Sequence, residues 1–153
     1  MEWVTALRGK VVGLDTTPLV YFIEESPAYL PIVLPFFAAV DRGEFTIVTS
    51  MVTLLEVLVH PLRHGNTQLA QRYRDILLNA KGLTTVSLSQ EIAEEAARLR
   101  AKYSLRTPDA IQMATAINNG ASFFLTNDTR LPSLPNLQVL IVDNLARGPN
   151  PKS

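Results

Sequence analysis

Residues 11–18 read VVGLDTTP, and they place a short apolar stretch directly before the expected start of a helix. Val11 to Leu14 has the apolar, partly β-branched character of a buried strand. Thr17 can cap a helix whose first position is Pro18, because that position has no N–H bond to lose. We therefore predict a strand that runs into a helix, with Asp15 at the carboxyl end of the strand.

The alternation of strand and helix continues along the whole chain. Further strands are predicted at Phe45–Val48, Thr84–Val86, Ser122–Thr126 and Leu137–Val142. Helices are predicted at 18–24, 29–42, 51–59, 68–79, 87–103 and 109–118. His60 and Pro61 should end the helix 51–59, and Thr107 with Pro108 should open the last helix by the same cap-then-proline pattern. This order predicts an α/β sandwich whose central parallel sheet has about five strands.

Length and composition indicate one globular domain. The chain has 153 residues, of which 47% are hydrophobic and 18% charged, so it can bury a core. We expect a single domain over residues 1–146 and a flexible tail over 147–153, where two prolines and a glycine gather. Fourteen Lys and Arg balance fourteen Asp and Glu, which excludes a polycationic binder and leaves nucleic-acid contacts to local patches.

Several classes of chemistry are excluded by residue usage. The absence of cysteine removes disulfides, thiolate catalysis and thiolate metal centres. No glycine pair forms a dinucleotide loop and no Gly-Lys forms a phosphate loop. A haloacid-dehalogenase-type phosphatase is disfavoured, since Thr17 stands where that family has its acid/base aspartate.

The location and assembly of the protein are predicted from its most apolar run. Ile32 to Val40 spans 9 residues, well short of the ~20 that cross a bilayer, and the first ten residues show no secretory signal. We therefore expect a cytoplasmic protein without a membrane segment. The run is predicted to form a core helix or an interface helix. An exposed apolar stripe containing Phe36 and Phe37 would require a partner, and on this basis we predict a homodimer.

Four carboxylates stand where parallel sheets bind ligands, outside the carboxyl ends of the strands. Asp15 and Asp128 follow two predicted strands, Asp109 lies in the first turn of a helix, and Glu56 lies within the helix 51–59. Taken singly, the three aspartates have ordinary structural roles as a helix cap, a dipole partner and a turn residue. For Asp15 the capping and functional roles are equally plausible from sequence.

Glu56 is the least easily explained of the four acids. Its helix is apolar on nearly every side, which is typical of a buried helix, and no Lys or Arg lies three or four residues away. If the four carboxylates converge, each pair at ~4 Å repels by about 4 kcal/mol, so a cation must lie between them. Oxygen ligands, with only His60 and His64 as histidines, favour Mg²⁺ or Mn²⁺ over zinc.

The sequence around these acids resembles that of the PIN-domain nucleases. The stretches VVGLDT (11–16), TLLEV (53–57), TPDAI (107–111) and LTND (125–128) resemble the four acidic motifs of that family, in order. The match covers about Val11 to Val142, and the small single-domain form looks most like the VapC-type toxin nucleases.

The resemblance implies a PIN-like α/β/α sandwich and a metal-dependent endoribonuclease that uses Mg²⁺ or Mn²⁺ and leaves a 5′-phosphate. Asp15 and Asp109 match the direct metal ligands, whereas Glu56 and Asp128 ligate the ion or orient its bound water. Polar residues that support this cluster in the family match Thr16, Thr126 and Asn127. The expected partners are an RNA substrate, a small antitoxin and a second copy of the chain.

Basic and aromatic residues near the acids are candidates for RNA contacts. Arg98, Arg100, Lys102 and Arg106 form a run without an intervening acid, and Arg106 is expected nearest the site. Trp3 and Tyr103 have rings that can stack on bases, although packing is their more ordinary role. The alternative hypothesis is a non-catalytic PIN-fold module that binds RNA or protein.

Overall fold

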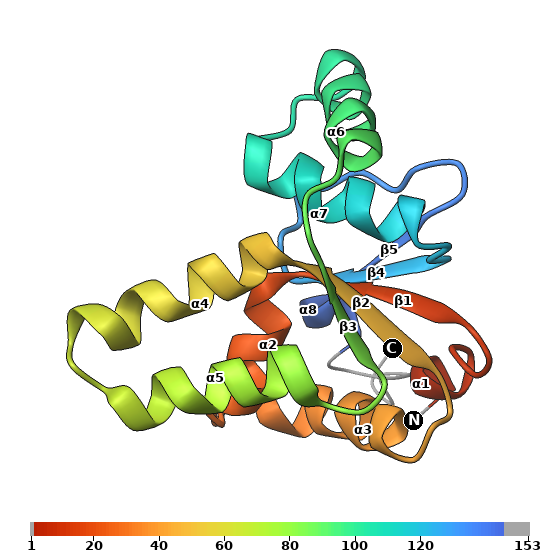
Figure 1. Ribbon diagram of the computed structural model, residues 1–153. Coiled ribbons are helices and arrows are strands. Elements are labelled where there is room, and N and C mark those ends of the chain that lie inside the picture. The colour runs from red at the N-terminus through yellow and green to blue at the C-terminus, as the bar shows by residue number, and fades with distance from the viewer. Residues whose placement is uncertain (1, 146–153) are drawn as a thin grey trace.

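In a computed structural model, which describes residues 2–145, one parallel sheet lies between two layers of helices (Figure 1). The strand order is β3-β2-β1-β4-β5, with β1 at the centre of the sheet. The chain adds β2 and β3 on one side of β1, and it then returns to the other side to add β4 and β5. The predicted α/β/α sandwich with five parallel strands is confirmed. The strands are β1 (Val11–Leu14), β2 (Thr46–Ser50), β3 (Leu83–Val86), β4 (Phe123–Thr126) and β5 (Gln138–Ile141).

Two hydrophobic cores cover the two faces of the sheet. Alternate residues of a strand point to opposite faces, so Val12 and Leu14 pack with one core and Phe124 with the other. The first core lies under α1 (Glu2–Thr5), α2 (Thr16–Ile23), α3 (Leu30–Asp41) and α5 (Thr67–Asn79). The second lies under α6 (Gln90–Lys102) and α7 (Thr107–Asn118).

Helix α7 lies very close to the central strand. A Cβ atom added to Gly13 would come within 2.6 Å of the Ala116 Cβ and 2.7 Å of a Phe124 ring carbon. Glycine in β1 and alanine in α7 therefore allow the helix to pack directly on the sheet. This close packing places the first turn of α7, with Asp109, beside the carboxyl end of β1.

Several helix boundaries differ from the sequence-based predictions, and three of the differences concern the helices that carry the acids. Helix α2 begins at Thr16 with Asp15 as its N-cap, so Thr17 lies inside the helix rather than capping it. Helix α7 begins at Thr107, and Arg106 precedes it without a side-chain cap. Helix α4 (Met51–Arg63) continues past Pro61, because one missing N–H near the end of a helix costs little of its hydrogen bonding.

The predicted exposed stripe over Ile32–Val40 is wrong. In α3 the side chains of Val33 and Phe36 are fully buried, and Phe37 is only 8% exposed. The Phe36 ring packs edge-on against Phe37 and stacks with Trp3, which also takes the packing role expected of it. The apolar run therefore supplies the core, and it no longer supports a dimer.

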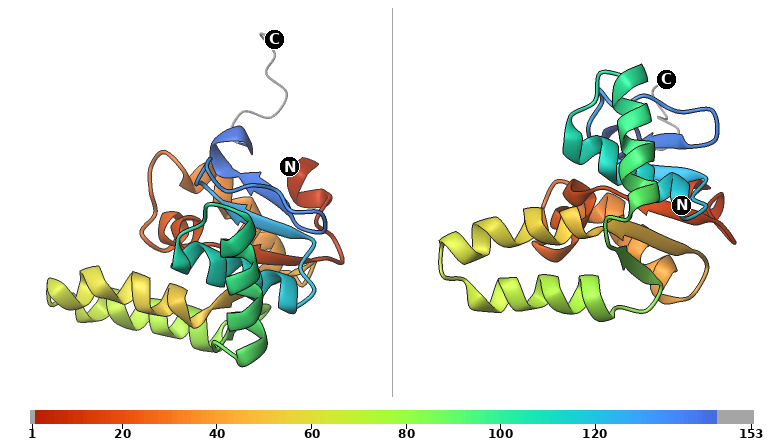
Figure 2. Two further views of the ribbon diagram at one scale, coloured as in Figure 1. Left: turned by 90° about the horizontal axis from the view of Figure 1, so that it is seen from above. Right: turned by 45° about the horizontal axis from the view of Figure 1, so that its top comes forward.

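Helices α4 and α5 form a hairpin that projects from the body of the molecule (Figure 2). One side of α4 packs through Val57 into the first core, whereas Leu55 and Leu62 are 65% and 57% exposed. Helix α4 is therefore not buried all round, and Glu56 is exposed. A projecting hairpin has too few neighbours to cover an apolar helix on every side.

The remaining features lie near the ends of the chain. Helices α1 and α8 (Val142–Leu145) were not predicted, since four residues are too few to show a helical period. The predicted tail over 147–153 lies outside the described residues. Within residues 2–145, no helix combines the length and hydrophobicity needed to cross a bilayer.

Candidate active site

Asp15 and Asp109 are both nearly buried at the carboxyl edge of the sheet, each only 9% exposed. Asp15 follows β1 directly, and its Oδ1 accepts a hydrogen bond from the Thr16 N–H at 2.8 Å. Its Oδ2 accepts a hydrogen bond of 2.7 Å from the Thr126 hydroxyl at the end of β4. Asp15 is therefore both a helix cap and a carboxylate fixed at the site, so the two roles are compatible.

Three of the predicted acids interact electrostatically. Burial raises the pKa of Asp15, its two hydrogen bonds oppose that rise, and the negative charges of Asp109 and Glu56 raise it further. Such repulsion requires the three carboxylates to lie near one another. The structure thus brings together acids that stand on α2, α4 and α7, far apart in the sequence.

Glu56 is held at the site through Thr16. The Thr16 hydroxyl donates to Glu56 Oε1 at 2.6 Å, while the Thr16 backbone binds Asp15. One residue therefore fixes the orientation of two carboxylates without neutralising either charge. This contact agrees with the supporting role predicted for Thr16.

A buried polar network, which the sequence did not reveal, lies beneath these acids. Gln112 donates from Nε2 to the Thr53 hydroxyl at 2.5 Å, and it lies 3.4 Å from the Thr16 hydroxyl. Thr49 donates its proton to the Leu14 carbonyl at 2.8 Å, so Thr53 is the donor in the 2.8 Å contact between the two hydroxyls. Helical spacing was the available signal, since Gln112 and Thr53 each lie one turn from a predicted acid.

Asp109 is paired with the arginine that precedes its helix. Arg106 Nε lies 3.0 Å from Asp109 Oδ2, and Arg106 Nη2 lies 3.4 Å from Oδ1. The Arg106 side chain is 65% exposed, so this ion pair faces solvent. The position predicted for Arg106, next to the acidic site, is the one observed.

Asp128 is paired with Arg130, which the sequence analysis missed. Arg130 Nε and Nη2 approach the two Asp128 oxygens at 2.9 and 2.8 Å, and this pairing lowers the pKa of Asp128. The Asp128 N–H donates to the Thr126 hydroxyl at 3.0 Å, which links Asp128 to Asp15 through one side chain. The sequence signal for this ion pair was the position of Arg130, two residues after an aspartate in a predicted turn.

Asn127 lies beside the acids but makes its hydrogen bonds elsewhere. Its Nδ2 donates to the Tyr21 hydroxyl at 3.0 Å, and its Oδ1 accepts from the Asp143 N–H at 2.9 Å. Asp143 in turn accepts a hydrogen bond from Tyr29. These two hydrogen bonds connect the end of β4 to α2 and α8, and they hold the backbone of Asn127 in place next to Asp128.

Comparison with known proteins identifies the family. The family model of the PIN domain matches residues 12–137, which include all four acids. The chain belongs to the PIN domain family. The relationship predicted from the acidic motifs is thus confirmed, and no curated protein matches the chain in sequence.

Solved structures of low sequence identity share the PIN fold. A toxin-antitoxin complex from Klebsiella pneumoniae has a chain 24% identical, with a TM-score of 0.62 over 83% of this chain and 94% of its own. VapBC2 from Rickettsia felis, bound to a DNA fragment from its promoter, is 20% identical, with a TM-score of 0.66 over 86% and 98%. VapC20 from Mycobacterium tuberculosis, a Sarcin-Ricin loop cleaving toxin, is 14% identical, with a TM-score of 0.60 over 74% and 86%.

The acids of this PIN domain fit a hard divalent cation in their chemistry. Carboxylate and hydroxyl oxygens surround Asp15, and no positively charged side chain binds either Asp15 or Glu56 among the described residues. In the observed conformation, however, residues 2–145 hold no group of three His, Asp or Glu side chains arranged to hold an ion. In this conformation both oxygens of Asp109 face Arg106 and both oxygens of Asp128 face Arg130.

Proposed function

We propose that this PIN domain is an endoribonuclease that depends on Mg²⁺ or Mn²⁺. The observation that carries the proposal is the convergence of Asp15, Glu56 and Asp109: Thr16 hydrogen-bonds both Asp15 and Glu56, and Asp15 and Asp109 are both nearly buried. Burial is the main cause of the raised pKa of Asp15, and the charges of Asp109 and Glu56 add to it. A site that concentrates negative charge and supplies neutral hydrogen-bond donors favours a cation. Family membership supports a nuclease, because the match covers all of these acids.

Asp15 and Asp109 are the residues that would hold the ion directly, with Glu56 and Asp128 completing the site or orienting its bound water. When bound, the ion supplies a water of lowered pKa and neutralises charge that develops on the phosphate. Thr126 and Thr16 fix the Asp15 carboxylate by one hydrogen bond to each oxygen. Thr16 also fixes Glu56, so the orientations of both acids are set before a ligand arrives.

The two arginines give the site a way to bind RNA. Arg106 and Arg130 are largely exposed and pair with Asp109 and Asp128. If Asp109 and Asp128 held a cation, both guanidinium groups would be free to bind phosphates of the RNA backbone. The two arginines would then pair with the acids in the metal-free protein and contact RNA in the metal-bound protein.

The proposed biological role is the toxin of a type II toxin-antitoxin pair, in the cytoplasm and as a homodimer. Its support is the fold shared with a toxin-antitoxin complex and with VapBC2. A small antitoxin is the expected protein partner. The exposed apolar residues of α4, Leu55 and Leu62, replace Phe36 and Phe37 as the candidate contact surface between subunits.

The proposal is tested by incubating the protein with a mixture of structured RNAs. Cleavage is expected with Mg²⁺ or Mn²⁺, and it should disappear in EDTA and in the Asp15→Ala variant. The matched control is Asp75→Ala, which removes an exposed acid of α5. Equal cleavage by wild type and Asp15→Ala would refute the assigned site.

The second candidate, a non-catalytic RNA- or protein-binding module, is favoured by one observation. Half of the acids are already neutralised by the chain's own arginines. Such a module would bind its partner without turnover, with little effect of Asp109→Asn or Glu56→Gln on affinity. Loss of metal-dependent cleavage in both variants decides for the nuclease.

A further inference from the structure

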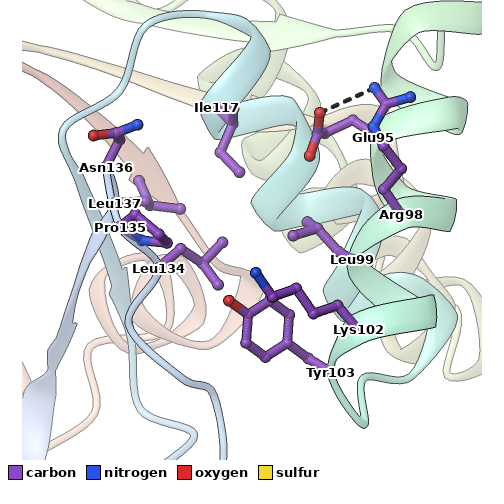
Figure 3. A pocket seen from close by; sticks show the side chains of 10 residues that line it. All are labelled: Glu95, Arg98, Leu99, Lys102, Tyr103, Ile117, Leu134, Pro135, Asn136 and Leu137. Carbon is purple, nitrogen blue, oxygen red and sulfur yellow. Dashed lines mark hydrogen bonds and ion pairs between the residues drawn. The ribbon is translucent and has the colours of Figure 1, made fainter.

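A pocket of about 260 Å³ lies on the outer side of α6 and α7, separate from the acidic site (Figure 3). Leu99 and Ile117 form its floor with Leu134 and Leu137, which come from the segment before β5. This segment is held in a tight turn by two hydrogen bonds between the Leu134 and Leu137 backbones. The pocket is therefore built on packed residues rather than on a loose loop.

The rim of the pocket is polar and positively charged. Lys102 and Tyr103 come from the end of α6, and the Lys102 Nζ lies 5.7 Å from the centre of the Tyr103 ring. Arg98 lies on the same helix and pairs with Glu95 at 3.1 Å. Within the described residues, Lys102 has no carboxylate partner, so the net charge of the rim is positive.

These features match one nucleotide unit of a nucleic acid. An apolar slot beside an aromatic ring accepts a base, a lysine accepts the attached phosphate, and an amide such as that of Asn136 can bind the edge of the base. A purely apolar ligand would make no contact with the positively charged side chains of the rim. A simple anion would leave the apolar floor of the pocket exposed to water. An acidic peptide is the competing occupant, and the test below separates the two.

The position of the pocket favours RNA. Only two residues separate Tyr103 from Arg106, so their Cα atoms are at most about 11 Å apart. Arg100 donates to the Leu105 carbonyl at 3.0 Å, which fixes the connecting turn. No acid occurs between Glu95 and Asp109, so the segment that connects the pocket to the acidic site carries only positive charges, those of Arg98, Arg100, Lys102 and Arg106.

We propose that the pocket formed by Lys102, Tyr103, Ile117 and Leu134–Leu137 binds a nucleotide of the RNA substrate that flanks the scissile bond. The inference rests on the proposed nuclease function and adds a second contact for the same strand. The pocket holds the base, and Arg106 holds a phosphate nearer the site. Tyr103 then has a binding role as well as a packing role.

The test is binding of a short fluorescein-labelled single-stranded RNA in EDTA, measured by fluorescence anisotropy. Loss of base stacking in Tyr103→Leu is expected to weaken binding about tenfold. Lys102→Gln, an exposed change that leaves the fold intact, should also weaken binding and reduce its salt dependence. The control Lys81→Gln removes an exposed lysine elsewhere and should bind RNA as the wild type does.

A second measurement locates the ligand directly. Adenosine 5′-monophosphate should shift the amide NMR signals of Tyr103, Ile117 and Asn136, whereas inorganic phosphate should not. Wild-type RNA affinity in both pocket variants would overturn the inference, as would shifts caused only by an acidic peptide. Because these experiments exclude metal, they fail independently of the nuclease proposal, which fails when the wild type leaves RNA intact in Mg²⁺.

Discussion

The acidic site has two halves, which differ in the groups that bind their carboxylates. Asp15 and Glu56 are held by neutral donors, namely the hydroxyl and backbone groups of Thr16 and Thr126. Asp109 and Asp128 are each paired with an arginine of the same chain. Among the described residues, the first half therefore has no cationic partner, whereas each acid of the second half has an arginine partner.

The largest effect is expected when the charge of Asp15 is removed from the half that is held by neutral donors. Asp15→Asn should lower metal-dependent RNA cleavage by about a hundredfold or more, because loss of a ligand should exceed the 10–100-fold typical of residues that orient ligands. Initial cleavage rates at saturating Mg²⁺ measure the effect. Asp75→Asn, an exposed acid on α5, is the control and should keep full activity.

The hydroxyl that orients Asp15 should have the next largest effect. Thr126→Val removes the 2.7 Å hydrogen bond to Asp15 Oδ2 and should reduce cleavage about 10–100-fold. It should also lower the free energy of unfolding by about 1–3 kcal/mol, since a buried acceptor loses its partner. Thr126→Ser keeps the hydroxyl and is expected to retain activity, so equal losses in both variants would assign the effect to packing.

A smaller effect is expected when the arginine half loses one pair. Exposed ion pairs contribute about 0.2–1 kcal/mol, so Arg130→Gln should raise the affinity for Mn²⁺ by up to about fivefold. The same change should reduce the salt dependence of RNA binding by about one phosphate contact. Calorimetry with Mn²⁺ and RNA titrations at several salt concentrations give the two values, and Arg63→Gln serves as control. A fall in Mn²⁺ affinity would show that Arg130 does not compete with the ion.

The smallest expected effect is a difference in pH dependence between the two halves. The pKa of Asp15 is raised on folding, so the metal-free protein should lose stability as pH rises from the ordinary aspartate value through that raised pKa. The pKa of Asp128 is lowered, so its contribution is present above the ordinary value and is lost as pH falls through the lowered pKa.

Thermal melting in metal-free buffer across the acidic range measures both effects. Asp15→Asn should remove the loss of stability that occurs as pH rises, and Asp128→Asn should remove the loss of stability that occurs as pH falls. Identical pH profiles for the two variants would show that the halves do not differ in electrostatics.

The sheet and the four acids were predictable because both follow from local patterns. Short apolar strands alternate with helices. Asp15 directly follows β1, and Asp128 follows β4 after one residue, Asn127. Burial was less predictable. The run containing Phe36 looked suited to an interface and proved to be core, whereas Leu55 lies on a projecting hairpin and is exposed. Such outcomes depend on which elements become neighbours, and periodicity does not contain that information.

The partners of the acids were the least predictable part of the site. Gln112 and Thr53 meet across 59 positions of sequence, and their hydrogen bond depends on how α7 crosses the sheet. Arg130 is only two residues from Asp128, yet a turn aspartate and a nearby arginine pair in some turns and not in others. Residue type and spacing located the charges, whereas the local geometry at the start of α7 and in the turn after β4 decided which charges are paired.

The central claim is that carboxylates from separate elements bind one divalent cation together. Anomalous diffraction from crystals soaked in Mn²⁺ tests it most directly. The account predicts a manganese peak within ligand distance of Asp15 and at least one of Glu56, Asp109 and Asp128, with Arg106 and Arg130 turned away. Well-diffracting crystals with no manganese at these carboxylates, and with both arginine pairs intact at saturating Mn²⁺, would contradict it.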